Sequence, residues 1–323
     1  MSQVAFENNT NNVVLNNNNN PLDAFEIKKK LSSSKYSVYH AADKKNNQQV
    51  ALKVFPHTSE FAAINYKRES VCYSKFDHPN IIKMIESVEN TQSNNSLDTR
   101  ASTVSYIALE YAKYGDLFEI ISNAGYMSEE LARSIFHQLV DGIEHMHQRK
   151  VAHLDLKIEN ILLDEKFRVK ITDFDLSQAI TEGASLEARG TPGYRAPEVK
   201  KGTCINFEAA DIYSLGIVLF VMLSGNPPYS EVDKGLGHEF DPFYRLMRTN
   251  TPKFWQIHAQ FKKDKNFYSE DLISLIDWML SENSECRPSI EDIKNHPWYT
   301  QQILSKECYE VEIKKYLKRA NKL

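Results

Sequence analysis

Short apolar runs separated by polar turns fill the first third of the chain. Residues 38–41 and 50–54 are apolar and β-branched runs on either side of a polar turn, and residues 81–85 and 104–110 form a second such pair. Runs of this kind, bounded by polar clusters, are typical of strands joined as hairpins. The polar stretch 90–103 joins the second pair. We interpret it as an enlarged surface loop and a neutral insertion, because long loops cost little stability.

Longer segments show the spacing of helices. Residues 59–76 have helical periodicity, and Ser128 is a candidate N-cap for a second helix. The apolar residues that recur at helical spacing behind this cap are Leu131, Ile135, Leu139, Ile143 and Met146. The longest apolar run, near residues 217–223, is far too short to cross a bilayer. We therefore expect no membrane span.

The two ends of the chain differ from its middle. Nine of the first twenty residues are asparagine and large apolar groups are few, so residues 1–24 are predicted to be a disordered extension. Residues 300–323 form a basic tail, and in its last part, residues 310–323, Val311, Ile313 and Leu317 mix with five basic residues. An amphipathic helix that docks on the preceding domain or recruits a regulatory partner is one interpretation. A frayed, solvated helix is the other, and the terminal position favours it.

Composition limits the class of protein. The chain has 323 residues, of which 41% are hydrophobic and 25% charged, as in a globular protein. Its net charge of −4 gives no reason to expect nucleic acid or an anionic membrane as a partner. The four cysteines show no metal-ligand spacing, and the amino terminus does not resemble a signal peptide. We therefore expect a reduced setting, in the cytoplasm or the nucleus.

Four polar side chains stand in an order that points to phosphoryl transfer. They are Lys53 in VALKV, Asp155 and Asn160 in HLDLKIEN, and Asp173 in DFD. Such a transfer needs a cation on the phosphates, oxygen ligands on Mg²⁺ and a carboxylate at the nucleophile. Lys53 has apolar neighbours, and an unpaired buried ammonium is too costly, so it must find an anion or a route to solvent. A purely structural ion pair is the alternative for Lys53.

These motifs in this order resemble a eukaryotic protein kinase of the serine/threonine type over residues 25–299. The ending His296, Pro297 and Trp298 is similar to the last helix of the calcium/calmodulin-dependent group. The resemblance implies an α+β, bilobal fold. A small antiparallel β-sheet lobe with helix C would cover residues 25–110, and a larger, mainly helical lobe residues 113–299. Three motifs depart from the family: the glycine-rich loop has no glycine, HRD reads HLD, and DFG reads DFD.

The resemblance also implies the cofactors ATP and Mg²⁺ and a role for each retained residue. Lys53 would bind the α- and β-phosphates and pair with Glu69 of helix C. The implied catalytic residues are Asp155 for the proton of the substrate hydroxyl, Lys157 for the γ-phosphoryl, Lys53 and Glu69, and the implied metal ligands are Asn160 and Asp173. Loop capping is the alternative role for the residues of the catalytic loop.

The nucleotide site carries the largest departure. The implied nucleotide-binding residues are Leu31, Ser32, Ser34, Ser37, Val38, Ala51, Lys53, Glu110, Ala112, Asp116 and Leu162. Serines replace the loop glycines, and the loop is one residue short. Glycine lets a backbone approach phosphate closely, whereas serine keeps a small side chain and a hydroxyl donor. We expect weakened rather than lost ATP affinity; the alternative is a loop that does not touch phosphate.

Several other positions match the family by resemblance alone. Tyr73, His153 and Phe174 match the apolar column that links the lobes of active kinases. Asp175 replaces the glycine of DFG, and aspartate is among the few residues that tolerate left-handed backbone there. Residues 190–198 resemble the end of an activation segment, with Thr191 as a serine/threonine signal. In the same way we expect Glu198 to pair with Arg287 and Asp211 to hold the catalytic loop.

Two positions bear on regulation. Leu154 stands where kinases switched by activation-loop phosphorylation carry arginine, and Glu187 stands where they carry the phosphorylated threonine. Leucine cannot gather a phosphate. We therefore predict an activation segment that is ordered without phosphorylation.

The sequence predicts an ATP-dependent serine/threonine protein kinase of reduced activity, acting on protein Ser/Thr hydroxyls. Glu159 and Asp116 lie where similar kinases that prefer basic substrates hold arginine, so the resemblance implies substrates with basic residues before the Ser/Thr; carboxylates pair well with arginine. The alternative is a weak or inactive pseudokinase that acts as a scaffold or allosteric partner. The retained charged residues favour catalysis. A metabolite kinase is disfavoured by the peptide-type activation segment.

Overall fold

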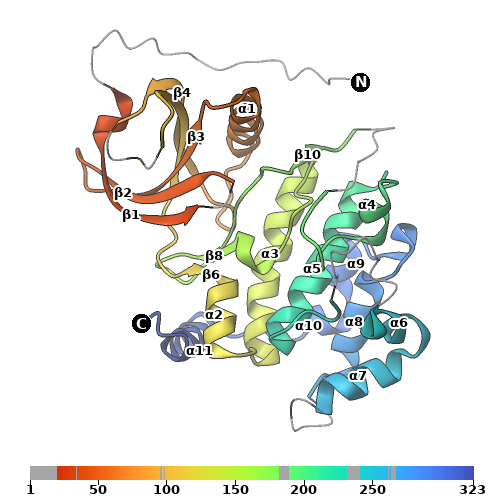
Figure 1. The fold of residues 1–323 in the computed structure, drawn as a ribbon. Coiled ribbons are helices and arrows are strands. Elements are labelled where there is room, and N and C mark those ends of the chain that lie inside the picture. The colour runs from red at the N-terminus through yellow and green to blue at the C-terminus, as the bar shows by residue number, and fades with distance from the viewer. Residues whose placement is uncertain are drawn as a thin grey trace.

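The computed structural model describes residues 20–33, 35–94, 97, 99–181, 189–230, 241–260, 262 and 267–323. A small lobe with a sheet stands above a larger, mainly helical lobe (Figure 1). The small sheet is antiparallel, in the order β1-β2-β3-β5-β4. The elements of the small lobe are η1 (Pro21–Ala24), β1 (Phe25–Ser33), β2 (Ser37–Asp43), β3 (Gln49–Pro56), α1 (Glu60–Ser74), β4 (Met84–Gln92) and β5 (Thr103–Glu110).

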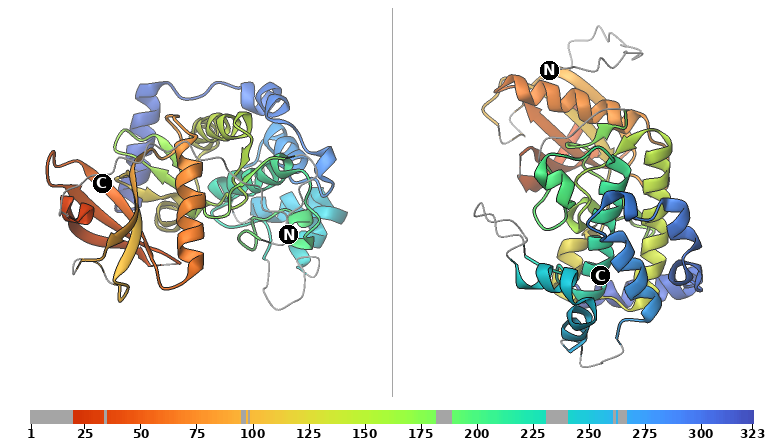
Figure 2. Two further views of the ribbon diagram at one scale, coloured as in Figure 1. Left: turned by 90° about the horizontal axis from the view of Figure 1, so that it is seen from above. Right: turned by 90° about the vertical axis from the view of Figure 1, so that its right-hand side faces the viewer.

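Alternation along β3 decides where Lys53 points. Successive side chains of a strand face opposite sides of the sheet. Leu52 and Val54 are buried in the core on the outer face of the sheet, together with Tyr106 of β5. Phe55 belongs instead to the core that the sheet shares with α1, which runs alongside it in both views of Figure 2. Lys53 therefore lies on the face that carries α1 and the cleft.

The predicted strand at residues 81–85 lies too early. The strand of the sheet is β4, and Ile81 and Ile82 precede it with exposures of 1% and 2%. Ile81 forms a bridge with Ile171 of the large lobe, and the Ile82 amide donates to the Ile171 carbonyl at 2.9 Å. These two apolar residues join the lobes, a role that periodicity cannot distinguish from strand pairing. The polar insertion is correspondingly shorter, between Gln92 and Thr103.

The disordered extension predicted for residues 1–24 is too long, because residues 21–24 form the short helix η1. Residues 1–19 lie outside the described residues, but η1 packs on the sheet. Leu22 is 2% exposed, and the Asn20 amide donates to the Gln92 carbonyl at 2.8 Å. One buried leucine is enough to fix this short turn against the sheet, whereas the asparagine-rich composition predicted disorder through residue 24.

The large lobe is built on two long buried helices. Its helices are α2 (Leu117–Ala124), α3 (Glu129–Gln148), α4 (Pro197–Lys201), α5 (Phe207–Ser224), α6 (Pro242–Thr249), α7 (Thr251–Gln260), α8 (Glu270–Met279), α9 (Ile290–Asn295), α10 (Pro297–Thr300) and α11 (Lys306–Arg319). Its short elements are β6 (Gly115–Asp116), β7 (Val151–Ala152), η2 (Ile158–Asn160), β8 (Ile161–Leu163), β9 (Val169–Ile171), β10 (Gln178–Ala179) and η4 (Ser284–Cys286). The predicted cap is confirmed, since the Ser128 hydroxyl accepts from the Leu131 amide at 3.4 Å.

Helix α5 is long and strongly apolar. By length and composition α5 would pass for a membrane-crossing helix, and among the described residues no other helix does. Its 18 residues are, however, 94% buried inside the protein. A core helix satisfies the same criterion, so α5 gives no support for a membrane span.

The carboxyl-terminal tail is a docked helix, so the frayed helix that we favoured is wrong. Helix α11 packs against α2 and α3 (Figure 1). Ile313 and Leu317 are fully buried, and the Tyr309 hydroxyl donates to the Phe167 carbonyl at 2.7 Å. Val311, grouped with them by sequence, is 51% exposed. The apolar face that we offered to a regulatory partner is therefore already occupied by the large lobe.

Leu317→Ala should destabilise the protein measurably. Removing a buried leucine side chain costs about 2–5 kcal/mol, through lost burial and the cavity that remains. Chemical denaturation would measure the loss, with Val311→Ala of the same helix as the matched control, expected within about 0.5 kcal/mol of wild type. Equal, small effects of both substitutions would mean that α11 does not dock as described.

Candidate active site

Lys53 is held between two carboxylates. Its Nζ lies 2.7 Å from Glu69 Oε1 and 2.8 Å from Asp173 Oδ1. Glu69, on α1, has a fully buried side chain, and that of Lys53 is 11% exposed. Three elements thus converge here: β3, helix α1 and the segment after β9. The predicted pairing of Lys53 with Glu69 is present. Helix α1 is thus the predicted helix C, and it points Glu69 inward, toward Lys53.

The charges of this group follow from its burial. Burial alone would lower the pKa of Lys53, but attraction to Glu69 and Asp173 outweighs burial and raises that pKa above its usual range. Burial would raise the pKa of Asp173, but attraction to Lys53 outweighs it and lowers that pKa. Burial raises the pKa of Glu69 to about 7, against the attraction of Lys53. Lys53 is therefore an ammonium and Asp173 a carboxylate at neutral pH.

A column of rings supports Asp173 from behind. The Phe174 ring lies 4.7 Å from the Tyr73 ring and 5.4 Å from the His153 ring, between centroids, as the resemblance implied. The Tyr73 hydroxyl also accepts from the Asp173 amide at 3.2 Å, a contact that the sequence did not indicate. Left-handed backbone occurs at Asp173, with φ of 68°, and not at Asp175. Our expectation for Asp175 is thus wrong, and the substitution imposes no left-handed strain there.

The catalytic loop brings the remaining predicted residues together. Lys157 Nζ lies 2.8 Å from Asp155 Oδ2 and donates to the Thr191 hydroxyl at 2.8 Å. The Thr191 amide and hydroxyl both donate to Asp155 Oδ1, at 2.8 and 2.7 Å. Asp155 is thus oriented by the activation segment as well as by its own loop. Thr191 entered the sequence analysis only as a specificity signal, and its bonds to Asp155 and Lys157 require the fold.

Asp211 fixes the backbone of this loop, as predicted. Its carboxylate accepts from the amides of His153 and Leu154, both at 2.8 Å. Leu154 has φ of 63°, a conformation that is uncommon for a non-glycine residue. Its side chain is buried. Leu154 therefore packs in the interior, whereas an arginine at this position would reach toward the activation segment. Glu187, the other residue of that hypothesis, lies outside the described residues.

The proposed metal ligands lie at the open end of one hairpin. Ile161 of β8 pairs with Ile171 of β9, and the Thr172 amide donates to the Asn160 carbonyl at 3.0 Å, so Asn160 and Asp173 are brought side by side. Asn160 turns its amide nitrogen to the Asp155 carbonyl, at 2.9 Å, which leaves its amide oxygen for a metal.

A carboxylate and an amide oxygen are hard donors that suit Mg²⁺. The described residues contain no group of three or more His, Cys, Asp or Glu side chains placed for a metal. Mg²⁺ would therefore need phosphate oxygens and water as well, which is usual for this ion.

The glycine-free loop is a tight hairpin turn. Ser33 lies opposite Ser37 in the β1–β2 register, and Ser32 opposite Val38. Because β1 ends at Ser33 and β2 begins at Ser37, three residues connect the strands, and the first of them, Ser34, lies outside the described residues. Leu31 of β1 is 41% exposed.

Tyr36 anchors this turn to helix C. Its hydroxyl accepts from the Asn65 amide of α1 at 2.6 Å, and its ring packs 4.5 Å from that of Phe55. Tyr36 is 8% exposed. The sequence did not predict this anchor, and the aromatic residue just before β2 was the available signal.

Three of the apolar residues expected to bind the nucleotide, Val38, Ala51 and Leu162, are half-buried. Ala51 lies opposite Leu109 in the β3–β5 register. The Glu110 carboxylate accepts from Lys170 at 2.7 Å, so the expected contact of Glu110 with a nucleotide would have to use its backbone, as would that of Ala112 two residues later. Asp116 is the N-cap of α2 and accepts from the Glu119 amide at 2.7 Å.

Glu159 is a second acid near this end of the cleft. Its Oε2 is buried and has no hydrogen-bond partner within the described part of the chain. Burial raises the pKa of Glu159, and burial likewise raises that of Asp116. A buried carboxylate oxygen without a partner is costly, so this position favours an incoming cation.

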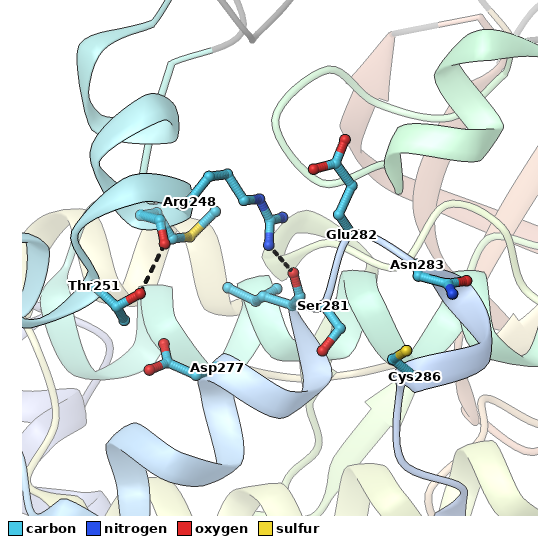
Figure 3. A pocket seen from close by; sticks show the side chains of 9 residues that line it. Arg248, Thr251, Asp277, Ser281, Glu282, Asn283 and Cys286 are labelled. Atoms are coloured by element: carbon cyan, nitrogen blue, oxygen red, sulfur yellow. Dashed lines mark hydrogen bonds between the residues drawn. The ribbon is translucent and has the colours of Figure 1, made fainter.

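A hollow in the large lobe lies outside the cleft (Figure 3). It has a volume of about 340 Å³. Arg248 points into it and donates to the Leu280 carbonyl at 2.6 Å. It contains none of the residues predicted for nucleotide, metal or catalysis. Its lining is Met247, Arg248, Thr251, Asp277, Leu280, Ser281, Glu282, Asn283 and Cys286.

The chain is similar to known serine/threonine kinases. CBL-interacting protein kinase 26 of Oryza sativa subsp. japonica is 34% identical over 287 residues, which cover 86% of this chain and 52% of that protein. Serine/threonine-protein kinase SRK2B of Arabidopsis thaliana is 30% identical over 303 residues, 93% of this chain and 78% of that protein. Probable serine/threonine-protein kinase MARK-C of Dictyostelium discoideum is 30% identical over 258 residues, 78% of this chain and 30% of that protein.

This chain thus spans about half the length of the rice relative and 30% of MARK-C. The family described as Protein kinase domain matches residues 25–299. The predicted bilobal α+β fold is confirmed by this match and by the two lobes of the structure. The chain belongs to the protein kinase family.

Proposed function

We propose that the protein is an active ATP- and Mg²⁺-dependent kinase that transfers the γ-phosphoryl group to Ser or Thr hydroxyls of proteins. The observation that carries the proposal is the placement of Lys53 between Glu69 and Asp173, at 2.7 and 2.8 Å. A buried ammonium with one carboxylate behind it and one facing the cleft is poised for an anionic ligand. A scaffold has no need of this arrangement.

Each retained residue has a chemical task. Bound ATP supplies the phosphoryl group, and Mg²⁺ neutralises its phosphates. Lys53 orients the phosphates, while Asn160 and Asp173 would hold the metal. Asp155 accepts the proton of the attacking hydroxyl, and Lys157, 2.8 Å from Asp155, stabilises the negative charge that develops on the transferred group.

The rival proposal is a pseudokinase that works as a scaffold or allosteric partner. Its support is the glycine-free loop and the aspartate of DFD. Both departures lie at positions that shape the backbone, and Asp175 has no left-handed φ that would strain it. The charged residues that act on the phosphoryl group are all kept, which favours catalysis.

Transfer of labelled γ-phosphate to a basic peptide with one serine tests the proposal. Wild type should label the peptide only with Mg²⁺ present, and Asp155→Asn should lose this labelling. A wild-type signal no higher than that of Asp155→Asn would favour the scaffold.

Dephosphorylation should leave the activity unchanged. Leu154 is buried and cannot bind a phosphate on the activation segment, so no charge-assisted pair is needed to order that segment. The test is treatment with a broad phosphatase, confirmation by mass spectrometry and measurement of kcat. A loss of about tenfold or more, equal to about 1.4 kcal/mol in barrier height, that rephosphorylation restores would refute the prediction.

The preferred substrates should carry Arg or Lys shortly before the Ser or Thr. The unpartnered oxygen of Glu159 and the nearby carboxylate of Asp116 would pair with such a side chain. A positional peptide library would measure the preference, and Glu159→Gln should weaken it without a similar effect on the ATP KM. Selection for acidic or proline-flanked sites would contradict this prediction.

A further inference from the structure

Two of the altered motifs meet across the cleft. Lys35, in the glycine-free loop, donates from Nζ to Asp175 Oδ2 of DFD at 2.9 Å. The Lys35 side chain is 52% exposed and that of Asp175 16%. The other carboxylate oxygen, Asp175 Oδ1, is buried and has no hydrogen-bond partner among the described residues. Lys35 thus supplies the opposite charge for a largely buried carboxylate.

The contact lies at the phosphate end of the nucleotide site. Asp175 is two residues after Asp173, so their Cα atoms are at most about 7.6 Å apart. Asp173 in turn lies 2.8 Å from Lys53. A triphosphate held by Lys53 therefore comes within reach of the flexible, four-carbon side chain of Lys35.

The loop presents Lys35 in a defined place. Its neighbour Tyr36 is pinned to Asn65 at 2.6 Å and to the ring of Phe55. Tyr36 thus fixes the backbone next to Lys35, and from there the Lys35 side chain reaches Asp175. Loops with glycines instead bring their backbone amides close to phosphate.

We infer that Lys35 is a phosphate-binding residue, which replaces the lost backbone contacts of the glycine loop and is held in position by Asp175 until ATP binds. The inference rests on the proposed function only in placing ATP in this cleft. A triphosphate carries more negative charge than one carboxylate, so it competes for the ammonium. Without Lys35, the additional negative charge of Asp175 would repel the phosphates. Lys35 therefore compensates for the aspartate that replaces the glycine of DFG.

Equilibrium binding of ATP, ADP and adenosine, measured by calorimetry with Mg²⁺ present, tests this inference without any transfer reaction. Lys35→Met should weaken ATP binding by about tenfold, the effect of one charge-assisted hydrogen bond. ADP binding should weaken less, and adenosine binding should not change. Lys28→Met is the matched control, because Lys28 lies on β1, the strand that enters the same loop, and pairs with Glu26 at 2.6 Å.

The Asp175→Gly background separates two roles of Lys35. If Lys35 binds phosphate, Lys35→Met still weakens ATP binding about tenfold in that background, and Asp175→Gly alone binds ATP at least as tightly as wild type. If Lys35 only neutralises Asp175, the effect of Lys35→Met disappears there and the inference is wrong.

Equal weakening of ATP and adenosine binding by Lys35→Met, or no ATP binding by wild type at millimolar concentration, would also overturn the inference. Lys35-dependent ATP binding in a protein that transfers no phosphate would refute the proposed function and support this inference.

Discussion

Lys53→Met is expected to reduce kcat/KM for phosphoryl transfer by about 100- to 1,000-fold, the usual cost of removing one positioned donor from a transition state. Methionine keeps the length of the side chain but cannot hold the phosphates or offset Glu69 and Asp173. Helix α1 also loses the ion pair that draws Glu69 inward, at 2.7 Å. Steady-state transfer to a serine peptide measures the effect.

Lys67→Met is the matched control for this experiment. Lys67 lies on α1, is 64% exposed and pairs with Glu89 at 3.1 Å, so its loss should change the rate by less than about twofold. Similar rates for wild type and Lys53→Met would mean that the observed transfer does not come from this site.

Arg287→Met should be among the most destabilising substitutions in the large lobe, by about 3–5 kcal/mol. The Arg287 side chain is fully buried and binds both oxygens of Glu198, at 2.6 and 2.8 Å. It also donates to the carbonyls of Ala209, Ser281 and Glu282. Its removal leaves these acceptors and a carboxylate that is 15% exposed without their donors.

Chemical denaturation would measure the effect of Arg287→Met. Arg245→Met, at an exposed arginine of α6, serves as the control and should stay within about 0.5 kcal/mol of wild type. Adding Glu198→Gln to Arg287→Met should recover part of the loss, because the unpaired charge disappears. A loss below about 1 kcal/mol for Arg287→Met would show that the pair does not hold the activation segment to the large lobe.

The sequence predicted the site better than its surroundings. Lys53, Asp155, Asn160 and Asp173 stand in short motifs whose order reflects one chemical task, so their convergence could be expected before the fold was known. Glu69 and the two lobes were expected only because the motifs resemble the kinase family. Pairings such as Glu198 with Arg287, 89 residues apart, were available only through the family resemblance, because spacing alone cannot relate them.

The errors arose where tertiary contacts outweigh local pattern. Leu22, Ile81 and Leu317 lie in polar, strand-like and basic segments, yet each is 2% exposed or less because another element covers it. The sequence around each residue cannot show which distant element buries it. The contact between Lys35 and Asp175 is of the same kind, since it joins residues 140 apart, one in the glycine-free loop and one in DFD. Neither motif indicated the other as its partner.

The most direct test of the central claim, that the retained charges sustain catalysis despite the altered loop, is a single-turnover measurement. Enzyme is held in excess over labelled ATP, so weak nucleotide affinity cannot hide the chemical step. Wild type should convert the bound label to phosphoserine peptide in one exponential phase, and Asp155→Asn, loaded to the same nucleotide occupancy, should be at least about 100-fold slower. Equal rates in the two proteins, or no phosphopeptide from fully loaded wild type, would contradict the claim.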